Sequence, residues 1–484
     1  MIEERIKNLC QVDYEPRIMI MNRGDLGVGI FDCEHFLTGC GYRVIRSADN
    51  EWLRYLYETQ IKGTKDKYAI LLTPGQVVPY DIQKAFYQVE LSLAALYPRL
   101  DPMTLKEYPL DLELIDFSYD DYYGKRRDSR ETQAFIEKQA FSKEAITRYL
   151  RYAEAFHAMK AKAAASWEDW LRIAKNGAAL SYYAAANGNV REDEEANEAF
   201  QTFLMDGYQK LSSISSKETP SILPKTWDLI AKSKTALIVM DGMSLFDFEV
   251  FRRSDWPFQY NYGASFALIP TITSVSRQAL IAGKYPSQLE NPFSLSKEES
   301  GFYAAAAEHG FSKNNVYYGR GYEADPEPFA RLAVIVINDI DDMVHGQLQG
   351  RQGMLQDVQL LSKTGKLQAL IRRLMDQGFT VYMTADHGNT ECIGTGALKR
   401  SGVETETKSR RMIVLKDYGE ASEDLKARTI QFPGYYLDKS YQYFICKGKT
   451  SFDGPGKQVM THGGMTIDEV IVPFIRITGE KRYG

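Results

Sequence analysis

Residues 235–242 read Thr-Ala-Leu-Ile-Val-Met-Asp-Gly, an apolar run that ends in an aspartate and a glycine. A short, continuous apolar run is typical of a strand that is covered on both faces of a parallel sheet. Asp241 would then lie at the carboxyl end of the strand, where the loops of a parallel sheet converge and ligands bind. The segment therefore predicts an α/β fold with an acidic side chain at the functional edge of its sheet.

A second apolar run, Val-Ile-Val-Ile at residues 334–337, is followed by Asp341 and His345. Residues four apart lie on one face of a helix, so this pair can hold one metal ion, although the spacing suits a local ion pair equally well. Asp339 and Asp342 compete for the same role, and the spacing favours Asp341. The second run is thus expected to bring a carboxylate and an imidazole to the same edge.

The remaining histidine motifs lie further along the chain. Residues 380–384 form a third run before Asp386 and His387, and Gly388 permits a sharp bend that lets both side chains reach one ion. His462 lies between a threonine and two glycines. Each motif alone could be a turn or a cap, but three of only six histidines occur in these motifs, and chance does not account for the combination.

Thr273 is the candidate nucleophile. Residues 276–282 are followed by Gly283 and predict a helix ended by glycine, so the Thr273 hydroxyl would lie at the helix N-terminus. Neither Glu nor Gln stands three residues on to complete a capping box, and the positive end of the helix dipole would favour an alkoxide and a phosphoryl oxygen. Thr271 and Ser274 remain alternative nucleophiles.

Together these side chains supply enough oxygen and nitrogen ligands for two metal ions that share one nucleophile. Zinc suits mixed Asp/His ligand sets and lowers the pKa of a bound hydroxyl. Two ions about 4 Å apart would stabilise the attacking and leaving oxygens of a phosphoryl transfer. We therefore expect a phosphothreonine intermediate that water then hydrolyses.

In this order the motifs resemble the alkaline phosphatase superfamily, and within it most closely the PglZ domain of BREX-type phage-defence systems. The resemblance covers roughly residues 230–480. It rests on Asp241-Gly242, Thr273-x-x-x-Arg277-x-x-Leu280-x-x-Gly283, Asp341-x-x-x-His345, Thr384-Ala385-Asp386-His387-Gly388 and His462. The family's fold is a central, mostly parallel sheet flanked by helices. Its members use a hydroxyl nucleophile and two ions, usually zinc, to cleave phosphomonoesters or phosphodiesters.

By position, the resemblance implies two ligand sets, with Thr273 contacting metal and Ser274 and Arg277 binding substrate. One ion would be held by Asp341, His345 and His462, and the other by Asp241, Asp386 and His387. We expect diester cleavage, because Arg277 is the only evident motif-adjacent clamp for a phosphate dianion. Arg320, Arg410 and Arg411 would weaken this argument if they reached the site.

Two relatives fit less well. Residues 384–391 also resemble cofactor-independent phosphoglycerate mutases, but those enzymes use a serine nucleophile and carry a long phosphate-handling domain that the short interval between Thr273 and Asp341 excludes. Sulfatases require a Cys-x-Pro-x-Arg or Ser-x-Pro-x-Arg motif, and none of the five cysteines has this context.

The sequence pattern predicts three domains: a small α/β domain at 1–110, receiver-like or Rossmann-like but degenerate, a helical bridging region at 111–225, and the catalytic domain at 226–484. Thr73 stands where a receiver would place its acceptor aspartate, so phosphorylation is not predicted. Residues 212–217 are serine-rich and lead to Pro220 and Pro224, which suggests a linker.

Composition narrows the functional classes. The chain has 44% hydrophobic residues and a formal net charge of -5, which predicts a globular protein without a basic field for coating nucleic acid. The five cysteines form no CxxC pair and are expected to be reduced thiols. The N-terminus is charged and no apolar stretch spans a bilayer, so we expect no membrane partner and a cytoplasmic location.

Two functions from different classes fit these patterns. The favoured one is a two-metal phosphodiesterase or phosphatase acting on a phosphoester, with nucleotides and oligonucleotides among the candidate substrates. The other is a scaffold of a defence complex that binds further defence proteins and carries a structural or slow metal site. Oligomeric state and natural substrate have no signal in the sequence.

Overall fold

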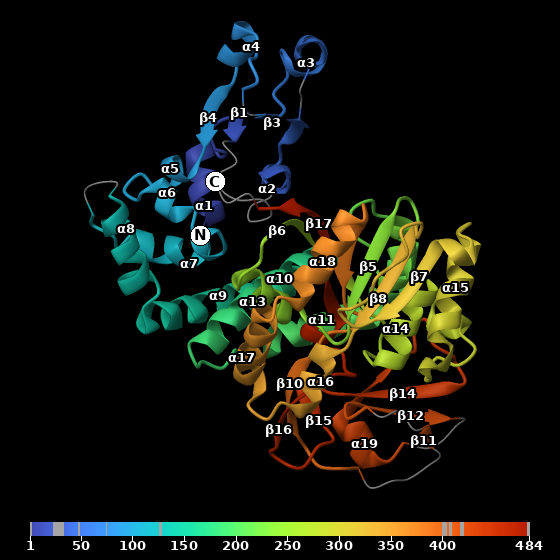
Figure 1. Cartoon of the computed structure of the whole chain (residues 1–484). Coiled ribbons are helices and arrows are strands. Elements are labelled where there is room, and N and C mark those ends of the chain that lie inside the picture. Colours follow the sequence, from blue (N-terminus) through green and yellow to red (C-terminus); the bar gives the residue numbers. More distant parts are fainter. Residues whose placement is uncertain are drawn as a thin grey trace. The chain divides into compact units, whose positions relative to one another are not determined.

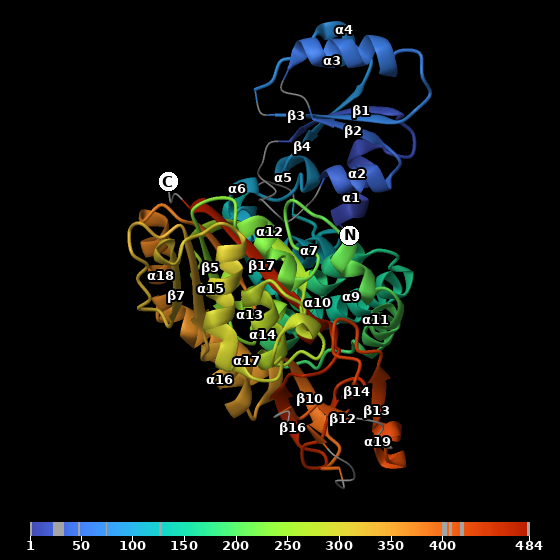
Figure 2. The same cartoon turned by 90° about the vertical axis from the view of Figure 1, so that its right-hand side faces the viewer.

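The computed structural model describes residues 2–22, 33–46, 49–73, 75–124, 128–398, 404–405, 409–416 and 421–481. The chain divides into two compact units, Met1–Tyr149 and Leu150–Gly484 (Figures 1 and 2). The three-domain division near residues 110 and 225 stays a prediction.

The first unit contains a small parallel sheet, as expected. Its strands are ordered β2-β3-β1-β4 and all pairs are parallel. The strands are β1 (Arg17–Asn22), β2 (Arg43–Arg46), β3 (Tyr68–Leu72) and β4 (Tyr87–Leu91). This order differs from the 2-1-3-4 order of receiver folds and from the 3-2-1-4 order of Rossmann folds. The unit therefore shares their parallel α/β character but not their topology.

Eight α-helices lie wholly within the described residues of the first unit. They are α1 (Ile2–Cys10), α2 (Cys33–Gly39), α3 (Asn50–Leu56), α4 (Tyr80–Lys84), α5 (Leu93–Leu96), α6 (Pro102–Leu105), α7 (Leu112–Tyr119) and α8 (Ser129–Phe135).

Three long helices follow, which confirms the helical pattern predicted for the middle of the chain. They are α9 (Lys143–Ala163), α10 (Trp167–Ala186) and α11 (Glu194–Asp206). Ser166 and Asp169 form a capping box at the start of α10, and Trp170 is buried against Phe200 of α11. Capping and aromatic burial thus join two of these helices inside the second unit.

The central sheet of the second unit has six strands in the order β6-β17-β9-β5-β8-β7 (Figure 1). β5, β7, β8 and β9 are parallel, and β17 runs antiparallel to its neighbours β6 and β9. The strands are β5 (Thr235–Met240), β6 (Phe258–Phe266), β7 (Val316–Arg320), β8 (Leu332–Ile337), β9 (Thr380–Thr384) and β17 (Ile471–Glu480). The three runs predicted from the sequence are therefore the three adjacent strands β9, β5 and β8, and the chain has the α/β fold that was expected.

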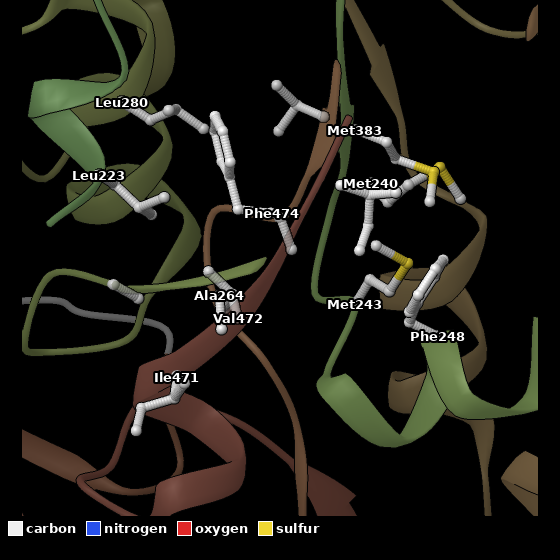
Figure 3. Close-up of a cluster of buried hydrophobic side chains, with 14 of the residues drawn as sticks. Leu223, Met240, Met243, Phe248, Ala264, Leu280, Met383, Ile471, Val472 and Phe474 are labelled. Carbon is white, nitrogen blue, oxygen red and sulfur yellow. The ribbon is translucent and has the colours of Figure 1, made fainter. Parts of the chain in front are cut away.

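Apolar side chains of this sheet meet helices on both sides. Figure 3 shows Phe474 of β17 beside Leu280, and Met240 of β5 near Met243 and Phe248. The helices around the sheet are α12 (Trp227–Ile230), α13 (Leu245–Arg253), α14 (Thr273–Ala282), α15 (Glu298–Glu308), α16 (Asp339–Gly346), α17 (Gly350–Lys363), α18 (Lys366–Asp376) and α20 (Ile467–Val470). Because β5 and β8 are buried along their whole length, the sheet is a rigid support for the loops at its edge.

Two small sheets lie between β9 and β17 in the chain, and the sequence patterns did not predict them. One has the order β15-β10-β16 and the other β11-β12-β14-β13. Their elements are β10 (Thr390–Gly394), β11 (Glu404–Thr405), β12 (Met412–Lys416), α19 (Glu423–Arg428), β13 (Thr429–Phe432), β14 (Tyr441–Cys446), β15 (Thr450–Ser451) and β16 (Gln458–Thr461).

The segment expected to be a linker is packed into the second unit. The Ser212 backbone N–H donates to the Tyr436 hydroxyl at 3.1 Å, and the Ser221 hydroxyl donates to the Leu211 carbonyl at 2.8 Å. Ile222 and Leu223 are fully buried in the main core. Serine and proline are common both in linkers and in surface loops, so composition alone did not reveal that this loop ends in the core.

All five cysteines are free thiols. In the part of the chain that the structure describes, no helix combines the length and the apolar character needed to cross a membrane.

Candidate metal centre and active site

Five of the predicted ligands meet at the edge where β5, β8 and β9 end. Asp241, Asp386 and His387 each offer a ligand atom, and these atoms lie within 4.8 Å of one another. Asp341, His387 and His462 form a second group by the same measure. His387 belongs to both groups, so the five side chains make one cluster, which we call the metal centre.

The imidazole nitrogens face the carboxylates across short gaps. His387 Nε2 lies 3.8 Å from Asp241 Oδ1 and 3.7 Å from Asp386 Oδ2. His462 Nε2 lies 3.4 Å from Asp341 Oδ1. These gaps are longer than good hydrogen bonds, and an ion could bind between the facing atoms.

Three carboxylate oxygens of the metal centre are buried without a hydrogen-bond partner among the described residues: Asp241 Oδ1, Asp341 Oδ1 and Asp386 Oδ2. Burying a charged oxygen without a partner is costly, and such orphans in native structures call for an ion or another ligand. The three oxygens are the same atoms that face the imidazoles. A donor set of carboxylate oxygens and imidazole nitrogens fits divalent cations, zinc among them.

Backbone carbonyls orient both buried imidazoles. His462 Nδ1 lies 3.0 Å from the Thr271 carbonyl oxygen, and His387 Nδ1 lies 3.0 Å from the Gly388 carbonyl oxygen. Because a carbonyl can only accept, each Nδ1 must carry the proton, and each Nε2 keeps its lone pair for a metal ion. This arrangement is the usual outer support of histidine ligands.

The two carboxylate oxygens of Asp386 differ in their contacts. The backbone N–H groups of Gly242 and His387 donate to Asp386 Oδ1 at 3.1 and 3.0 Å, so only Oδ2 is unpaired. Gly242 has φ +72, a conformation that favours glycine. At Gly388, a Cβ atom would lie 1.9 Å from the Asp468 carbonyl oxygen, so only glycine fits there.

His345 lies at the margin of the metal centre. Its Nε2 is 3.4 Å from Asp341 Oδ2, its ring centroid is 5.4 Å from that of His462, and its side chain is 54% exposed. It is not part of either group of converging ligand atoms. Asp339 and Asp342 are also outside these groups, so among the three aspartates only Asp341 reaches the centre. Ligation by His345 stays a prediction.

Thr273 is the first residue of α14. The residue before it, Ile272, is the N-cap and offers no side-chain cap, so Thr273 does not cap the helix. Its Oγ1 lies 3.0 Å from His387 Nε2. The predicted nucleophile is therefore in direct contact with a residue shared by both ligand groups.

The two alternative hydroxyls are placed differently. Thr271 is fully buried, and its Oγ1 donates to the Gly464 carbonyl at 2.9 Å and accepts from the Gly463 N–H at 3.1 Å. Thr271 thus holds the loop that carries His462. Ser274 follows Thr273 on the first turn of α14 and is partly exposed.

The candidate arginines are mostly occupied by carboxylates. Arg277 is 2% exposed; its Nη1 donates to Asp241 Oδ2 and its Nε donates to Glu298 Oε2 at 2.7 Å. Arg320 also donates to Glu298, at 2.7 Å. Arg411 is fully buried and pairs with Glu469, and Arg410 is half exposed and pairs with Asp453. Substrate binding by Arg277 stays a prediction, since its observed contacts are with protein.

Burial dominates the electrostatics of the centre. It raises the pKa of Asp386 to about 6. It also raises the pKa of Asp241 far above its usual range, and the charge of Asp386 adds to this shift. Burial opposes ionisation of Asp341 too, but the hydrogen bond from His345 and the charge that neighbouring imidazoles carry when protonated outweigh it and lower the Asp341 pKa. Neighbouring carboxylates that resist joint ionisation gain most from a bound cation.

Burial acts on His462 in the opposite sense, because the protonated imidazole is its charged form. The pKa of His462 is lowered to about 4. Its imidazole is therefore neutral at neutral pH and available as a ligand.

Sequence reasoning missed several supporting residues. Asn389 donates to the Gly242 carbonyl at 2.8 Å and to Asp247 Oδ2 at 2.6 Å, and it accepts from Arg351 at 3.0 Å. Its place two residues after His387 was an available signal. Glu298 is distant from every ligand motif in the sequence, and no local pattern marks it.

Comparison with solved structures found distant likenesses, each covering 50% of this chain. Murine ectonucleotide pyrophosphatase / phosphodiesterase 5 is 11% identical, with a TM-score of 0.33 and 87% of that chain covered. An inactive form of the same murine protein in complex with AMP is 10% identical, with a TM-score of 0.32 and 88% covered. Phosphonoacetate hydrolase from Sinorhizobium meliloti 1021 in complex with phosphonoformate is 10% identical, with a TM-score of 0.33 and 90% covered.

Comparison with curated proteins found no match. The family model described as the BREX system PglZ alkaline phosphatase-like domain matches residues 228–477, which include every residue of the metal centre. This match extends over more than half of the chain, and the protein therefore belongs to the PglZ family.

Proposed function

We propose that the protein is a metal-dependent phosphoric ester hydrolase in which Thr273 is the nucleophile and two divalent ions, zinc in our proposal, are bound. The observation that carries this proposal is the convergence of three buried, unpaired carboxylate oxygens with the Nε2 atoms of two buried imidazoles. The Thr273 hydroxyl lies 3.0 Å from one of these nitrogens. The family of the chain supports the same class of reaction.

Each ion would have its own ligand set. Asp241, Asp386 and His387 would hold one ion. Asp341 and His462 would hold the other, and His345 would complete this set from its place 3.4 Å from Asp341. The position of His387 within both groups supports two adjacent ions rather than two separate sites.

When bound, the two ions would lower the pKa of a coordinated hydroxyl and stabilise the negative charge that develops on the phosphoryl group. The Thr273 oxygen would attack phosphorus, its proton would pass to solvent, and the bond from phosphorus to the leaving oxygen would break. The leaving oxygen would take up a proton, and a phosphothreonine would remain. A water molecule would then attack phosphorus, the bond to Thr273 would break, and the hydroxyl would be restored.

The first turn of α14 would assist this transfer. Backbone N–H groups in the first turn of a helix lack intrahelical partners, and the positive end of the helix dipole favours a phosphoryl oxygen. Thr273 and Ser274 are the first two residues of this turn. We therefore assign Ser274 to substrate binding rather than to nucleophilic attack.

We propose a phosphodiester substrate. A phosphomonoester dianion carries an extra charge that a free arginine would normally bind. Arg277 and Arg411 are buried and paired with carboxylates, Arg320 donates to Glu298, and the half-exposed Arg410 pairs with Asp453. These contacts favour the less charged diester, with nucleotides and oligonucleotides as candidate substrates.

The family description names a BREX system, and we propose that the hydrolase serves such a phage-defence system in the cytoplasm, together with other defence proteins. The scaffold hypothesis remains the alternative, and it also includes bound zinc. Metal content therefore cannot separate the two functions, but turnover can.

The decisive experiment compares wild type with Thr273→Ala on bis(para-nitrophenyl) phosphate and para-nitrophenyl phosphate, with metal content measured on the same samples. We expect wild type to bind two zinc ions and to hydrolyse the diester faster, and we expect Thr273→Ala to keep the zinc and lose the turnover. A wild type that binds zinc without turnover of either ester would favour the scaffold, whereas equal turnover by the two proteins would contradict the assignment of Thr273 as the nucleophile.

A further inference from the structure

We infer that Glu298 controls the strength of one ion site from outside it, by cancelling the charge of Arg277 that would otherwise neutralise the ligand Asp241. This inference rests on the proposed two-ion function. Glu298 would touch neither ion nor substrate and would act through Arg277, so it is a positioning residue.

The three side chains form a buried chain of contacts. Arg277 Nη1 donates to Asp241 Oδ2, and Arg277 Nε donates to Glu298 Oε2 at 2.7 Å. All three side chains are at most 4% exposed. Asp241 Oδ1, the oxygen that faces His387, has no partner among the described residues. Arg277 thus occupies one oxygen of Asp241 and leaves the other for an ion.

Glu298 is held in place from its other side. Its Oε1 accepts from the Tyr318 hydroxyl and from Arg320 Nη2, the latter at 2.7 Å. It is the first residue of α15, where the helix dipole favours a negative charge. Three donors therefore hold the Glu298 carboxylate next to Arg277, and none of them belongs to a residue of the metal centre.

The charges of Asp241, Arg277 and Glu298 explain how Glu298 would affect the binding of the ion. Asp241 and Asp386 together bring two negative charges to their ion, and the buried Arg277 offsets one of them unless another carboxylate compensates it. Glu298 is that carboxylate. A buried charge that loses one partner interacts more strongly with its remaining partner. Without Glu298, the full positive charge of Arg277 would therefore act on Asp241.

Replacing Glu298 should weaken the binding of one ion only. Arg277 donates to Asp241, whereas Asp341 and His462 contact each other, His345 and a backbone carbonyl in the part of the chain that the structure describes. Glu298→Gln should therefore weaken the ion held by Asp241, Asp386 and His387 and spare the ion held by Asp341 and His462. A merely structural role would loosen both.

The chain offers a matched control in Glu249. This side chain is 3% exposed and lies between two arginines, with Arg252 Nη1 at 3.3 Å and Arg253 Nε at 3.2 Å. It belongs to α13 of the same unit and is outside the groups of converging ligand atoms. Glu249→Gln removes an equally buried charge between arginines without touching the Arg277 contacts.

The test titrates zinc-free protein with Zn²⁺ in competition with a chromophoric chelator, which gives the number of ions and the affinity of each. We expect two tight ions for wild type and for Glu249→Gln. For Glu298→Gln we expect one ion of unchanged affinity and one bound about 10–100-fold more weakly, the usual cost of losing an outer support of a metal site.

A second variant removes the charge of Arg277, to which we attribute the weaker zinc binding of Glu298→Gln. In the double variant Glu298→Gln/Arg277→Met no guanidinium remains to neutralise Asp241, so both ions should bind at least as tightly as in wild type. This variant also carries the test if Glu298→Gln does not fold, since replacing a buried ion pair by neutral side chains is often tolerated.

Three results would overturn the inference. Glu298→Gln could bind both zinc ions with wild-type affinity, or it could bind both equally more weakly. In the double variant, one zinc ion could still bind more weakly than in wild type. A wild type that binds no zinc would refute the proposed function itself, and that result is visible before any variant is compared.

Discussion

The rings of His387 and His462 stack face to face, with centroids 4.2 Å apart and an interplanar angle of 15°. Two protonated imidazoles would repel each other at this distance, whereas two neutral rings stack without penalty. Each ring also donates its Nδ1 proton to a carbonyl oxygen. The stack therefore brings the Nε2 atoms of both rings next to the carboxylate oxygens that face them.

The nucleophile can be identified among three neighbouring hydroxyls. Thr273→Ala should lower diester hydrolysis by several orders of magnitude, as loss of other covalent nucleophiles does, and Thr273→Ser should keep part of the rate because a hydroxyl survives. Ser274→Ala should change KM more than it changes kcat. Full activity of Thr273→Ala together with loss of activity in Ser274→Ala, with metal still bound, would move the assignment to Ser274.

Thr271 should affect metal binding rather than chemistry. Its hydroxyl bridges the Gly463 N–H and the Gly464 carbonyl, so Thr271→Val loses both contacts while Thr271→Ser keeps them. We expect Thr271→Val to weaken zinc binding about 10–100-fold at the ion held by His462, and Thr271→Ser to bind zinc like wild type. Zinc titration of both variants checks this, and equal affinities in the two would show that the His462 loop does not need the bridge.

Asp386→Asn should separate zinc binding from the stability of the zinc-free protein. The substitution keeps an oxygen that can accept from the Gly242 and His387 N–H groups. It removes a buried carboxyl group whose pKa is raised to about 6. We expect thermal unfolding with chelator to occur at or above the wild-type temperature. The stabilisation that zinc gives the wild type should be lost, because a ligand stabilises only the form that binds it.

His157 should make the protein less stable in mild acid. Burial, aided by the charge of Arg191, lowers its pKa from the ordinary 6.5 to about 4. The unfolded chain then binds a proton that the folded chain does not, so stability is complete above about pH 6.5 and falls as the pH decreases toward 4. The loss should reach roughly 2 kcal/mol at about pH 5.

Urea unfolding of wild type and His157→Gln at about pH 5 and at about pH 6.5 measures this contribution. The difference between the two proteins removes the effect of all other titrating groups. A glutamine amide can still donate and accept at this position. Parallel pH profiles for the two proteins would contradict the prediction.

Gly388 should tolerate no side chain. A Cβ atom there would lie 1.9 Å from a backbone oxygen, so Gly388→Ala should cost about 2–4 kcal/mol of unfolding free energy and lower zinc affinity. Gly346→Ala is the control, because a Cβ at Gly346 meets nothing within 4 Å. Chemical denaturation of both variants tests the pair, and similar stabilities would show that the loop can move.

The strands and the ligands that follow them could be predicted from the sequence, because a buried parallel strand is a continuous apolar run and its carboxyl end is marked by the first polar residue. Asp241 and Asp386 illustrate this rule. Glu298 could not be found in this way, since it meets Arg277 through the packing of two helices. The packing of the segment expected to be a linker near Ser212 could not be predicted, because its serines and prolines reflect local loop chemistry whereas the burial of Leu223 depends on tertiary contacts.

β17 lies between β6 and β9, and it immediately follows the loop and short helix that come after His462. During synthesis, Asp241, Asp386 and His387 emerge before His462 and before β17, the strand that joins β6 to the rest of the sheet. Until residues 471–480 arrive, β6 and β9 each present an unpaired edge, and strand edges of this kind invite wrong pairing. A nascent chain therefore completes this sheet only with residues 471–480, shortly after His462 has become available to the metal centre.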